Sequence, residues 1–358
     1  MPLFTRIRTA RAAVTVSVFW VVALGALPGC SKAPESPQPR TAGGDSSAGA
    51  AAKPALTKIR FRTDWFPQAE HGGFYQALAK GFYREAGLDV EIIPGGPGPT
   101  LPQLMMAGTA DLAMDRSDDV LVRVSNKLPF VIVSAFMERD PQAILVHDDD
   151  PVRSFPDLNG RTIMAIQNAN WIDYLKAQYH IDFQLIPLNF GIAQFMANPR
   201  FIQQCFITNE PFFIRKNGGH PRTLLIADSG YNPYRVIFAM QRFVREHPEA
   251  VRAFVAASIR GWDDFMNGDP APAKALISQA NTQMPPDLLD FTIATLRQYE
   301  MISGNPKLGE RTGLITRSRM KEQSDLLVRL KIVPEALPLD RFVRFDFLPL
   351  DMQEAAAR

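Results

Sequence analysis

The stretch Thr57–Val90 reads TKIRFRTDWFPQAEHGGFYQALAKGFYREAGLDV, and it decides the fold class. Polar and apolar residues alternate over Thr57–Thr63, which predicts a β-strand. Gly72–Glu85 is predicted to be a helix with one apolar face, and Gly87 ends it. Leu88–Ile93 predicts a second strand. A strand, a helix and a strand in this order are typical of a βαβ unit.

The same alternation of strands and helices continues along the chain. Further strands are predicted at Asp111–Met114, Phe130–Phe136, Ala143–His147, Arg161–Ile166, Phe183–Leu188, Gln203–Thr208, Thr223–Asp228 and Val236–Gln241. Helices are predicted between them at Leu101–Met106, Asp118–Asn126, Asn170–Tyr179 and Ile192–Met196, and in the C-terminal third at Val244–Asn267, Ala271–Gln279, Pro286–Tyr299 and Arg319–Leu330. This pattern predicts an α/β fold with mostly parallel sheets.

The N-terminal segment has the composition of an export signal. Three arginines precede an uncharged apolar run, Ala12–Leu27, and small residues and Cys30 follow. The run is shorter than the roughly 20 residues that a membrane-spanning helix needs. Leu27–Cys30 (LPGC) resembles a bacterial lipobox, so residues 1–30 are predicted to be a lipoprotein signal peptide with Cys30 as the lipidated residue. The alternative is an ordinary cleaved signal with an incidental cysteine.

Residues 31–56 are rich in Ala, Gly, Ser and Pro and almost free of large apolar residues. Such a segment cannot bury a core, so it is predicted to be a flexible linker. Together with Cys30 it predicts an exported protein that is anchored to a membrane through a lipid.

The overall composition excludes several classes of function. The formal net charge is only +2 and the globular part has no basic stripe, which argues against nucleic-acid binding. Cys205 is the only cysteine after Cys30, so neither an intrachain disulfide nor a cysteine-rich metal site is expected. The acidic runs Asp115–Asp119 and Asp148–Asp150 are interpreted as solvated faces rather than metal sites.

Four stretches of this chain resemble a known family. They are Thr63–Val90 within the opening stretch, Leu104–Asp111 (LMMAGTAD), Phe155–Ile166 (FPDLNGRTIMAI), and Asn209–Phe213 (NEPFF) with the later Arg245–Val251. Together they resemble the thiamine-pyrimidine-precursor (NMT/SsuA-like) branch of the substrate-binding proteins of ABC transporters. The resemblance covers about residues 57–270.

The resemblance implies a type II periplasmic-binding-protein fold, a two-lobed Venus-flytrap with a helical C-terminal part. Lobe 1 would comprise residues 57–140 and 235–345, lobe 2 residues 141–234, and the C-terminal tail residues 346–358. The ligand would bind between the lobes, which close around it by hinge motion. The implied partners are a small-molecule ligand and the permease and ATPase subunits of an importer, and the protein would be a monomer.

Asp64 and Trp65 follow the first predicted strand and are candidate ligand-binding residues. An indole offers a stacking surface for a planar ring. The alternative is a core tryptophan with Asp64 as a helix cap. His71 is a third candidate from the same segment, either as a hydrogen-bonding partner of the ligand or as a structural histidine.

Glu210 follows an apolar strand and precedes Pro211, and its carboxylate can accept two hydrogen bonds from an amino-substituted heterocycle. The alternative is a residue at a helix N-terminus, and both roles are compatible. Trp171 lies at the equivalent place in the second unit and is a candidate second wall of the cleft. A core position is the alternative for Trp171.

The expected function is a lipid-anchored solute-binding protein of an ABC importer that captures a planar N-heterocycle such as a thiamine pyrimidine precursor. No enzymatic activity, cofactor or metal is expected. A competing interpretation is an enzyme resembling the pyrimidine synthase of this family. That enzyme acts on a bound cofactor, and Lys80 can be aligned with a cofactor lysine, although Lys-Gly before an aromatic residue is common to binding proteins too. The enzyme also uses a cysteine cluster, whereas Asp228–Arg235 contains no cysteine here. The resemblance is also compatible with riboflavin, a sulfonate or nitrate as ligand, and with a protein that presents its ligand to a sensor.

Overall fold

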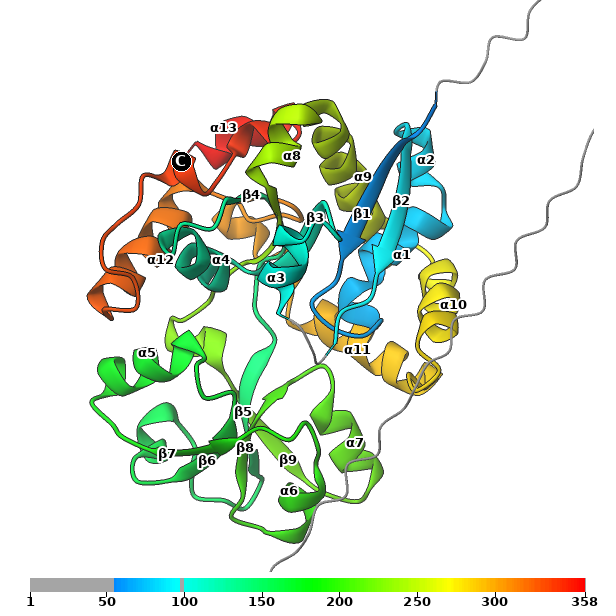
Figure 1. The fold of residues 1–358 in the computed structure, drawn as a ribbon. Coiled ribbons are helices and arrows are strands. Elements are labelled where there is room, and N and C mark those ends of the chain that lie inside the picture. Colours follow the sequence, from blue (N-terminus) through cyan, green and yellow to red (C-terminus); the bar gives the residue numbers. More distant parts are fainter. Residues whose placement is uncertain (1–54, 97–99, 358) are drawn as a thin grey trace, which may run out of the picture. The chain divides into compact units, whose positions relative to one another are not determined.

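The computed structural model describes residues 55–96 and 100–357 (Figure 1). Within these residues, ten strands form two separate five-stranded sheets, and helices pack around each sheet. The α/β two-lobed class predicted from the sequence is confirmed. Cys30 and the predicted signal peptide lie outside the described residues.

The first sheet has the strand order β2-β1-β3-β10-β4. Its strands are β1 (Thr57–Arg62), β2 (Leu88–Ile93), β3 (Leu112–Arg116), β4 (Phe130–Met137) and β10 (Arg235–Met240). β1 runs parallel to β2 and β3, whereas β10 runs antiparallel to both of its neighbours, β3 and β4. β4 is buried along its whole length, as its continuous apolar sequence predicts.

The second sheet has the strand order β7-β6-β8-β5-β9. Its strands are β5 (Gln142–His147), β6 (Thr162–Ala165), β7 (Gln184–Pro187), β8 (Ile202–Phe206) and β9 (Pro221–Leu225). β6 is parallel to β7 and β8, and β5 is antiparallel to β8 and β9. The prediction of mostly parallel sheets therefore needs one correction: each sheet contains one antiparallel strand.

The antiparallel strands β5 and β10 are the strands that directly follow a crossing between the sheets. The chain leaves the first sheet through residues 138–141 to enter β5, and it returns through residues 226–234 to enter β10. These two short segments connect the two lobes, and we call them the hinge segments, or the hinge.

The first lobe carries most of the helices, α1 (Gly72–Ala79), α2 (Phe82–Glu85), α3 (Leu101–Met106), α4 (Ser117–Ser125), α8 (Gln241–Glu246), α9 (Pro248–Asn267), α10 (Ala271–Ala280), α11 (Pro286–Gln298), α12 (Arg317–Arg329) and α13 (Leu350–Ala356). The second lobe carries α5 (Asn170–Tyr179), α6 (Ala193–Ala197) and α7 (Glu210–Lys216).

Two helices predicted as continuous are broken. Gly72–Glu85 divides into α1 and α2 because Gly81 adopts the left-handed conformation with φ 76°. Val244–Asn267 divides into α8 and α9 at His247, which precedes Pro248, and a residue before proline is disfavoured in helical geometry. α13 lies within residues 346–358, which the family resemblance implies to be a C-terminal tail.

α1 and α9 pack against each other through two glycines. A Cβ atom on Gly261 would lie 2.2 Å from the carbonyl oxygen of Gly73, and one on Gly73 would meet the Trp262 ring at 2.2 Å. Only glycine permits this approach. The packing fixes α1 behind the loop that carries Asp64 and Trp65.

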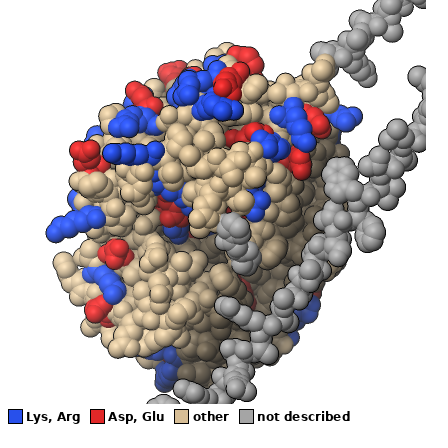
Figure 2. All heavy atoms as spheres, in the orientation of Figure 1, with Lys and Arg blue, Asp and Glu red and all other residues tan. Residues whose placement is uncertain are grey.

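On the face seen in Figure 2, acidic and basic side chains of the described residues are intermixed, and neither charge dominates. No helix among the described residues has the length and apolar character to cross a membrane.

Candidate functional site

A cleft of about 560 Å³ lies between the two sheets, at strand ends that meet near the hinge. Three of the five predicted ligand-binding residues, Asp64, Trp65 and Glu210, line it. The remaining lining residues include Phe66, Gln68, Asp115, Arg116, Asp119, Gln142, Ile166, Asn168, Leu188, Phe190, Gln204, Phe206, Asn209 and Arg235. Both sheets contribute to it, as expected for α/β proteins that bind ligands at carboxyl ends of strands.

Aromatic rings form one wall of the cleft. Trp65, from the loop after β1, contacts the ring of Phe66 with centroids 5.6 Å apart. It also contacts Phe190, from the loop after β7, at 5.1 Å. Because Phe190 belongs to the second lobe, the Trp65–Phe190 contact joins the two lobes across the cleft. Phe190 adopts a left-handed backbone with φ 60°, which is uncommon for a bulky residue.

Asp64 lines the cleft, but the protein itself occupies both of its carboxylate oxygens. Oδ1 lies 3.0 Å from Nε2 of His71, and Oδ2 accepts a 2.6 Å hydrogen bond from the guanidinium of Arg235. Burial opposes ionisation of Asp64, but the His71 hydrogen bond and the Arg235 charge outweigh it and lower the pKa. Asp64 is therefore a fixed anion at the cleft floor.

His71 is fully buried and does not line the cleft. It acts on the cleft only through Asp64, whose position its ring fixes. The structure places it as a residue behind the cleft wall.

Two arginines lie side by side at the cleft floor, because Arg116 on β3 and Arg235 on β10 are cross-strand partners. Arg235 also pairs with Asp140 of the hinge at 3.1 Å and stacks over the Phe206 ring at 5.0 Å. Arg116 pairs with Asp119 at 3.0 Å. Both guanidinium groups thus have carboxylate partners from the protein.

Glu210 is the first residue of α7 and is half-buried in the cleft. Its Oε2 accepts a 2.9 Å hydrogen bond from the backbone N–H of Phe206. Burial, with a smaller contribution from the charge of Glu70, raises the pKa of Glu210 to about 7. Glu70 itself is buried and accepts a hydrogen bond from the Thr208 hydroxyl of the other lobe.

Trp171 lies in the core of the second lobe and does not line the cleft. It is fully buried, and its ring stacks on Phe183 with centroids 6.5 Å apart. Of the two roles considered for this residue, the structure shows the core position. Phe190 provides the aromatic wall from this lobe, and the signal for it is an aromatic residue three positions after the end of β7.

The cleft is more acidic than basic. Four carboxylates, Asp64, Asp115, Asp119 and Glu210, line it together with the two arginines. Burial and the neighbouring charges of Asp118 and Asp115 raise the pKa of Asp119 to about 7 against the opposing charge of Arg116. Within the described ranges, no three potential ligands gather as a metal site.

Hydrogen bonds link the lobes on both sides of the cleft. On one side, Asn170 of α5 donates from Nδ2 to Asp118 of α4 at 2.9 Å. On the other side, the Thr292 hydroxyl of α11 donates to the Thr208 carbonyl at 2.7 Å. These contacts hold the lobes close together around the cleft.

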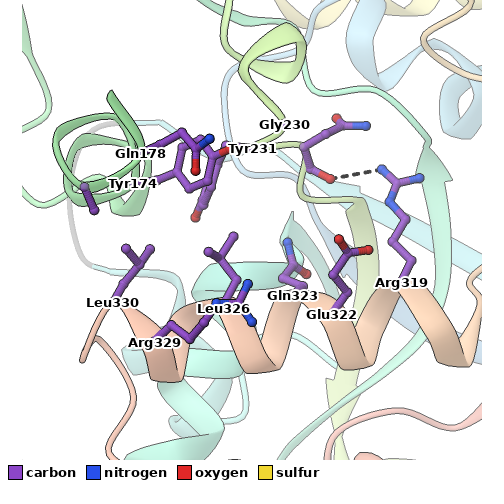
Figure 3. Close-up of a pocket in the computed structure, with 12 residues that line it drawn as sticks. Tyr174, Gln178, Gly230, Tyr231, Arg319, Glu322, Gln323, Leu326, Arg329 and Leu330 are labelled. Carbon is purple, nitrogen blue, oxygen red and sulfur yellow. Dashed lines mark hydrogen bonds between the residues drawn. The ribbon is translucent and has the colours of Figure 1, made fainter. Parts of the chain in front are cut away.

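A second hollow of about 440 Å³ lies between α5 and α12, with Tyr231 and the neighbouring hinge residues as its floor (Figure 3). Figure 3 shows Tyr174 and Gln178 of α5 facing Leu326 and Leu330 of α12. We call it the hinge-side groove. The Tyr231 hydroxyl donates a 2.5 Å hydrogen bond to Asp118 of α4.

Two residues bear on the enzyme interpretation. Lys80, which can be aligned with a cofactor lysine, does not line the cleft; its ammonium pairs with Asp264 of α9 at 2.7 Å. Cys205 lines the cleft, is 2% exposed, and has a pKa raised by burial. It is the only cysteine among the described residues.

Residues 68–273 match the family model described as "NMT1/THI5 like". The formylaminopyrimidine-binding protein of Halalkalibacterium halodurans is 26% identical over 250 residues, which are 64% of this chain and 73% of that protein. The riboflavin-binding protein RibY of Chloroflexus aurantiacus is 27% identical over 62% of this chain and 66% of that protein. A 4-amino-5-hydroxymethyl-2-methylpyrimidine phosphate synthase of Saccharomyces cerevisiae is 21% identical over 60% of this chain and 69% of that enzyme.

The fold is also found in solved structures. The alkanesulfonate-binding protein SsuA of Xanthomonas axonopodis pv. citri, solved bound to MOPS, superposes with a TM-score of 0.61 at 15% identity. The match covers 81% of this chain and 99% of that one. At this identity the likeness establishes the shared type II periplasmic-binding-protein fold.

Proposed function

Because this chain belongs to the NMT1/THI5-like family, we propose that it is the solute-binding protein of an ABC import system and that it captures a small planar N-heterocycle. The proposal rests on one observation above the others: Trp65 and Glu210, from different lobes, line the same cleft. A flat ring can stack on the indole while its edge meets the carboxyl group.

The electrostatics of the cleft favour a neutral or cationic ligand over an anion. A site for an anion needs positive charge that the protein has not already neutralised, whereas Arg116 and Arg235 already pair with Asp119, Asp64 and Asp140. A sulfonate or nitrate entering the cleft would also face the carboxylates of Asp64 and Asp115. These anions are therefore less compatible with the site than an amino-substituted heterocycle.

A pyrimidine precursor of thiamine is the proposed ligand, and riboflavin is the second candidate. One relative is a formylaminopyrimidine-binding protein and another is a riboflavin-binding protein. Glu210, with a pKa of about 7, can exchange hydrogen bonds with a ring nitrogen and its adjacent amino group in either protonation state.

A binding role is supported over a catalytic one. The synthase interpretation calls for a cofactor lysine and a cysteine cluster, whereas Lys80 is paired with Asp264 outside the cleft and Cys205 has no second described cysteine beside it. The proposed partners are the permease and ATPase subunits of an importer.

Calorimetry with a formylated aminopyrimidine, riboflavin and an alkanesulfonate tests the proposal. We expect the protein to bind the aminopyrimidine without converting it chemically during the incubation. We expect no binding of the sulfonate. At 100 times its Kd, a ligand stabilises the fold by about 2.7 kcal/mol, which a thermal-shift assay detects. Conversion of the pyrimidine, or binding of the sulfonate alone, would overturn the proposal.

We further propose that Cys30 is lipidated and anchors the protein on the outer face of a membrane. The support is the sequence pattern at Leu27–Cys30 and the richness of residues 31–56 in Ala, Gly, Ser and Pro. Metabolic labelling with a fatty acid should mark the wild-type protein and not the Cys30→Ser variant. Labelling of both proteins would contradict the anchor.

A further inference from the structure

Two glutamines in the cleft have amide groups whose orientation the protein fixes. The Oε1 of Gln204 on β8 accepts the backbone N–H of Ile166 at 3.0 Å. The Oε1 of Gln142 on β5 accepts a guanidinium N–H of Arg116 at 2.7 Å. Both partners can only donate, so the oxygen of each amide must face them. Each NH₂ group must therefore point elsewhere.

Both NH₂ groups are accessible from the cleft. Gln142 and Gln204 line it and are 6% and 5% exposed. Neither Nε2 atom has an acceptor among the described residues. Neither atom is among the fully buried polar atoms that lack a hydrogen-bond partner, so both reach the space of the cleft. If a bound ligand shields such a donor from water without offering it an acceptor, binding loses about 1–3 kcal/mol. A bound ligand is thus expected to provide acceptor atoms.

The strands place the two donors close together. β5 and β8 are antiparallel neighbours, with Gln142 opposite Phe206 and Ile144 opposite Gln204. Gln142 and Gln204 therefore lie on the same face of the sheet as diagonal neighbours. Phe206 is also the residue whose N–H binds Glu210. The two amide donors and the Glu210 carboxyl group thus surround one strand end.

Building on the proposed function, we infer that Gln142 and Gln204 determine specificity in the cleft. Their amide donors select a heterocycle that carries a neutral acceptor group, such as a formyl or ring carbonyl, and disfavour the matching compound with a cationic amine in that place. In this arrangement Trp65 and Glu210 bind the ring, and the two glutamines bind its substituent.

The test compares two probes, a 4-amino-5-formamidomethylpyrimidine and the corresponding 5-aminomethyl compound, by calorimetry. In Gln142→Glu and Gln204→Glu, one carboxylate oxygen keeps the bond to Arg116 or to Ile166, and the other faces the cleft as an acceptor. We expect each variant to shift the ratio of the two affinities towards the amine by more than tenfold. Gln178→Glu, in the hinge-side groove, adds the same charge outside the cleft and should leave the ratio within about threefold, since exposed charges are strongly screened.

The outcomes separate this inference from the proposed function. If the wild-type protein binds the formylated probe but both cleft variants keep its affinity ratio, the glutamines do not select the substituent and the inference is wrong, while the function stands. If the wild-type protein binds neither probe nor riboflavin, the proposed function and the inference both fail. Because the readout is a ratio within one variant, a partly unfolded sample does not imitate the expected shift.

Discussion

At the scale of single residues, the cleft divides into groups that the protein holds and groups that remain for a ligand. Asp64 has both oxygens occupied, by His71 and Arg235. Trp65, Glu210 and the two glutamine amides keep a free face or a free polar atom towards the cleft. A candidate ligand-binding residue is therefore identified by what its partners leave unused, and residue type alone does not show this.

Trp65→Ala is expected to weaken binding of the aminopyrimidine by more than tenfold. The substitution removes the stacking surface and the contact with Phe190, whose combined loss exceeds the roughly 1.4 kcal/mol that corresponds to a factor of ten. Calorimetry measures the change, and circular dichroism checks that the fold is intact. Trp65→Phe serves as the control that keeps a ring, and equal affinity in the alanine variant would exclude Trp65 from the site.

Glu210→Gln is expected to change how stability depends on pH. The pKa of Glu210 is about 7 in the folded protein and 4.5 ordinarily, so the folded state holds this proton more tightly between these values. Unfolding then releases the proton, and Glu210 lowers the stability of the wild-type protein progressively as pH rises from about 4.5 to 7.

The variant has no titrating carboxyl group at position 210. Its free energy of unfolding relative to the wild-type protein should therefore increase by about 1–3 kcal/mol as the pH rises from about 4.5 to 7, and stay constant above pH 7. Denaturant unfolding of the unliganded proteins at pH 4.5, 6 and 8 measures the difference. A difference that does not change with pH would show that Glu210 titrates normally.

At the scale of elements, the sequence predicts most strands and helices, including β5 and β10, but not that these two strands run antiparallel to their neighbours. Asn170–Tyr179 has the same bounds in the prediction and in the structure, because its apolar spacing is helical and polar segments flank it. β5 and β10 show strand composition but carry no local signal of direction, because each pairs with strands that are distant in the sequence. The break at Gly81 has no signal in the apolar pattern either, because this pattern continues from α1 into α2.

The candidate site is also predictable only in part, because contacts between residues that are distant in the sequence leave no local signal. Asp64, Trp65 and Glu210 follow strands closely, so their position relative to a sheet edge follows from the sequence. Trp171 also follows a strand, but α5 turns its ring into the core, where it stacks on Phe183. The register that places Gln142 beside Gln204 joins residues about sixty positions apart and has no local signature.

The contact between α1 and α9 yields a prediction about stability. Gly261→Ala would place a methyl group 2.2 Å from the Gly73 carbonyl oxygen, so the helices must separate. Overpacking of this kind costs about 1–3 kcal/mol, which outweighs the roughly 1 kcal/mol that alanine gains over glycine in a helix. Thermal unfolding measures the loss. Gly191→Ala, where the nearest atom to the new methyl would be 3.5 Å away, is the matched control and should be close to neutral.

At the scale of the whole molecule, the two lobes are held together by contacts that do not involve a ligand. Asn170 reaches Asp118 and Asp119 across one side of the cleft, and Thr208 contacts Glu70 and Thr292 on the other. If the lobes move apart these bonds are lost, so we expect them to add to the affinity for any ligand that the cleft surrounds in this arrangement.

Asn170→Ala should therefore weaken ligand binding by roughly tenfold although Asn170 does not line the cleft. The variant loses a hydrogen bond to a buried carboxylate, and such bonds contribute about 1.5–3 kcal/mol. Calorimetry gives the affinity, and small-angle scattering should show a more open unliganded protein. Lys216→Ala removes the ion pair to Asp287 that also spans the lobes, but this exposed pair should contribute little. An unchanged affinity in Asn170→Ala would mean that closure does not depend on this contact.

The position of β10 within the first sheet has a consequence for how the chain acquires its structure. β10 lies between β3 and β4, yet it is the last strand to be synthesised, about a hundred residues after β4. Until residues 235–240 are made, β3 and β4 lack the partner that joins them, whereas all strands of the second sheet already exist. A nascent chain can thus assemble the inserted lobe first. The same insertion that completes the first sheet also brings Arg235 to Asp64, so the floor of the cleft cannot form before β10 is made.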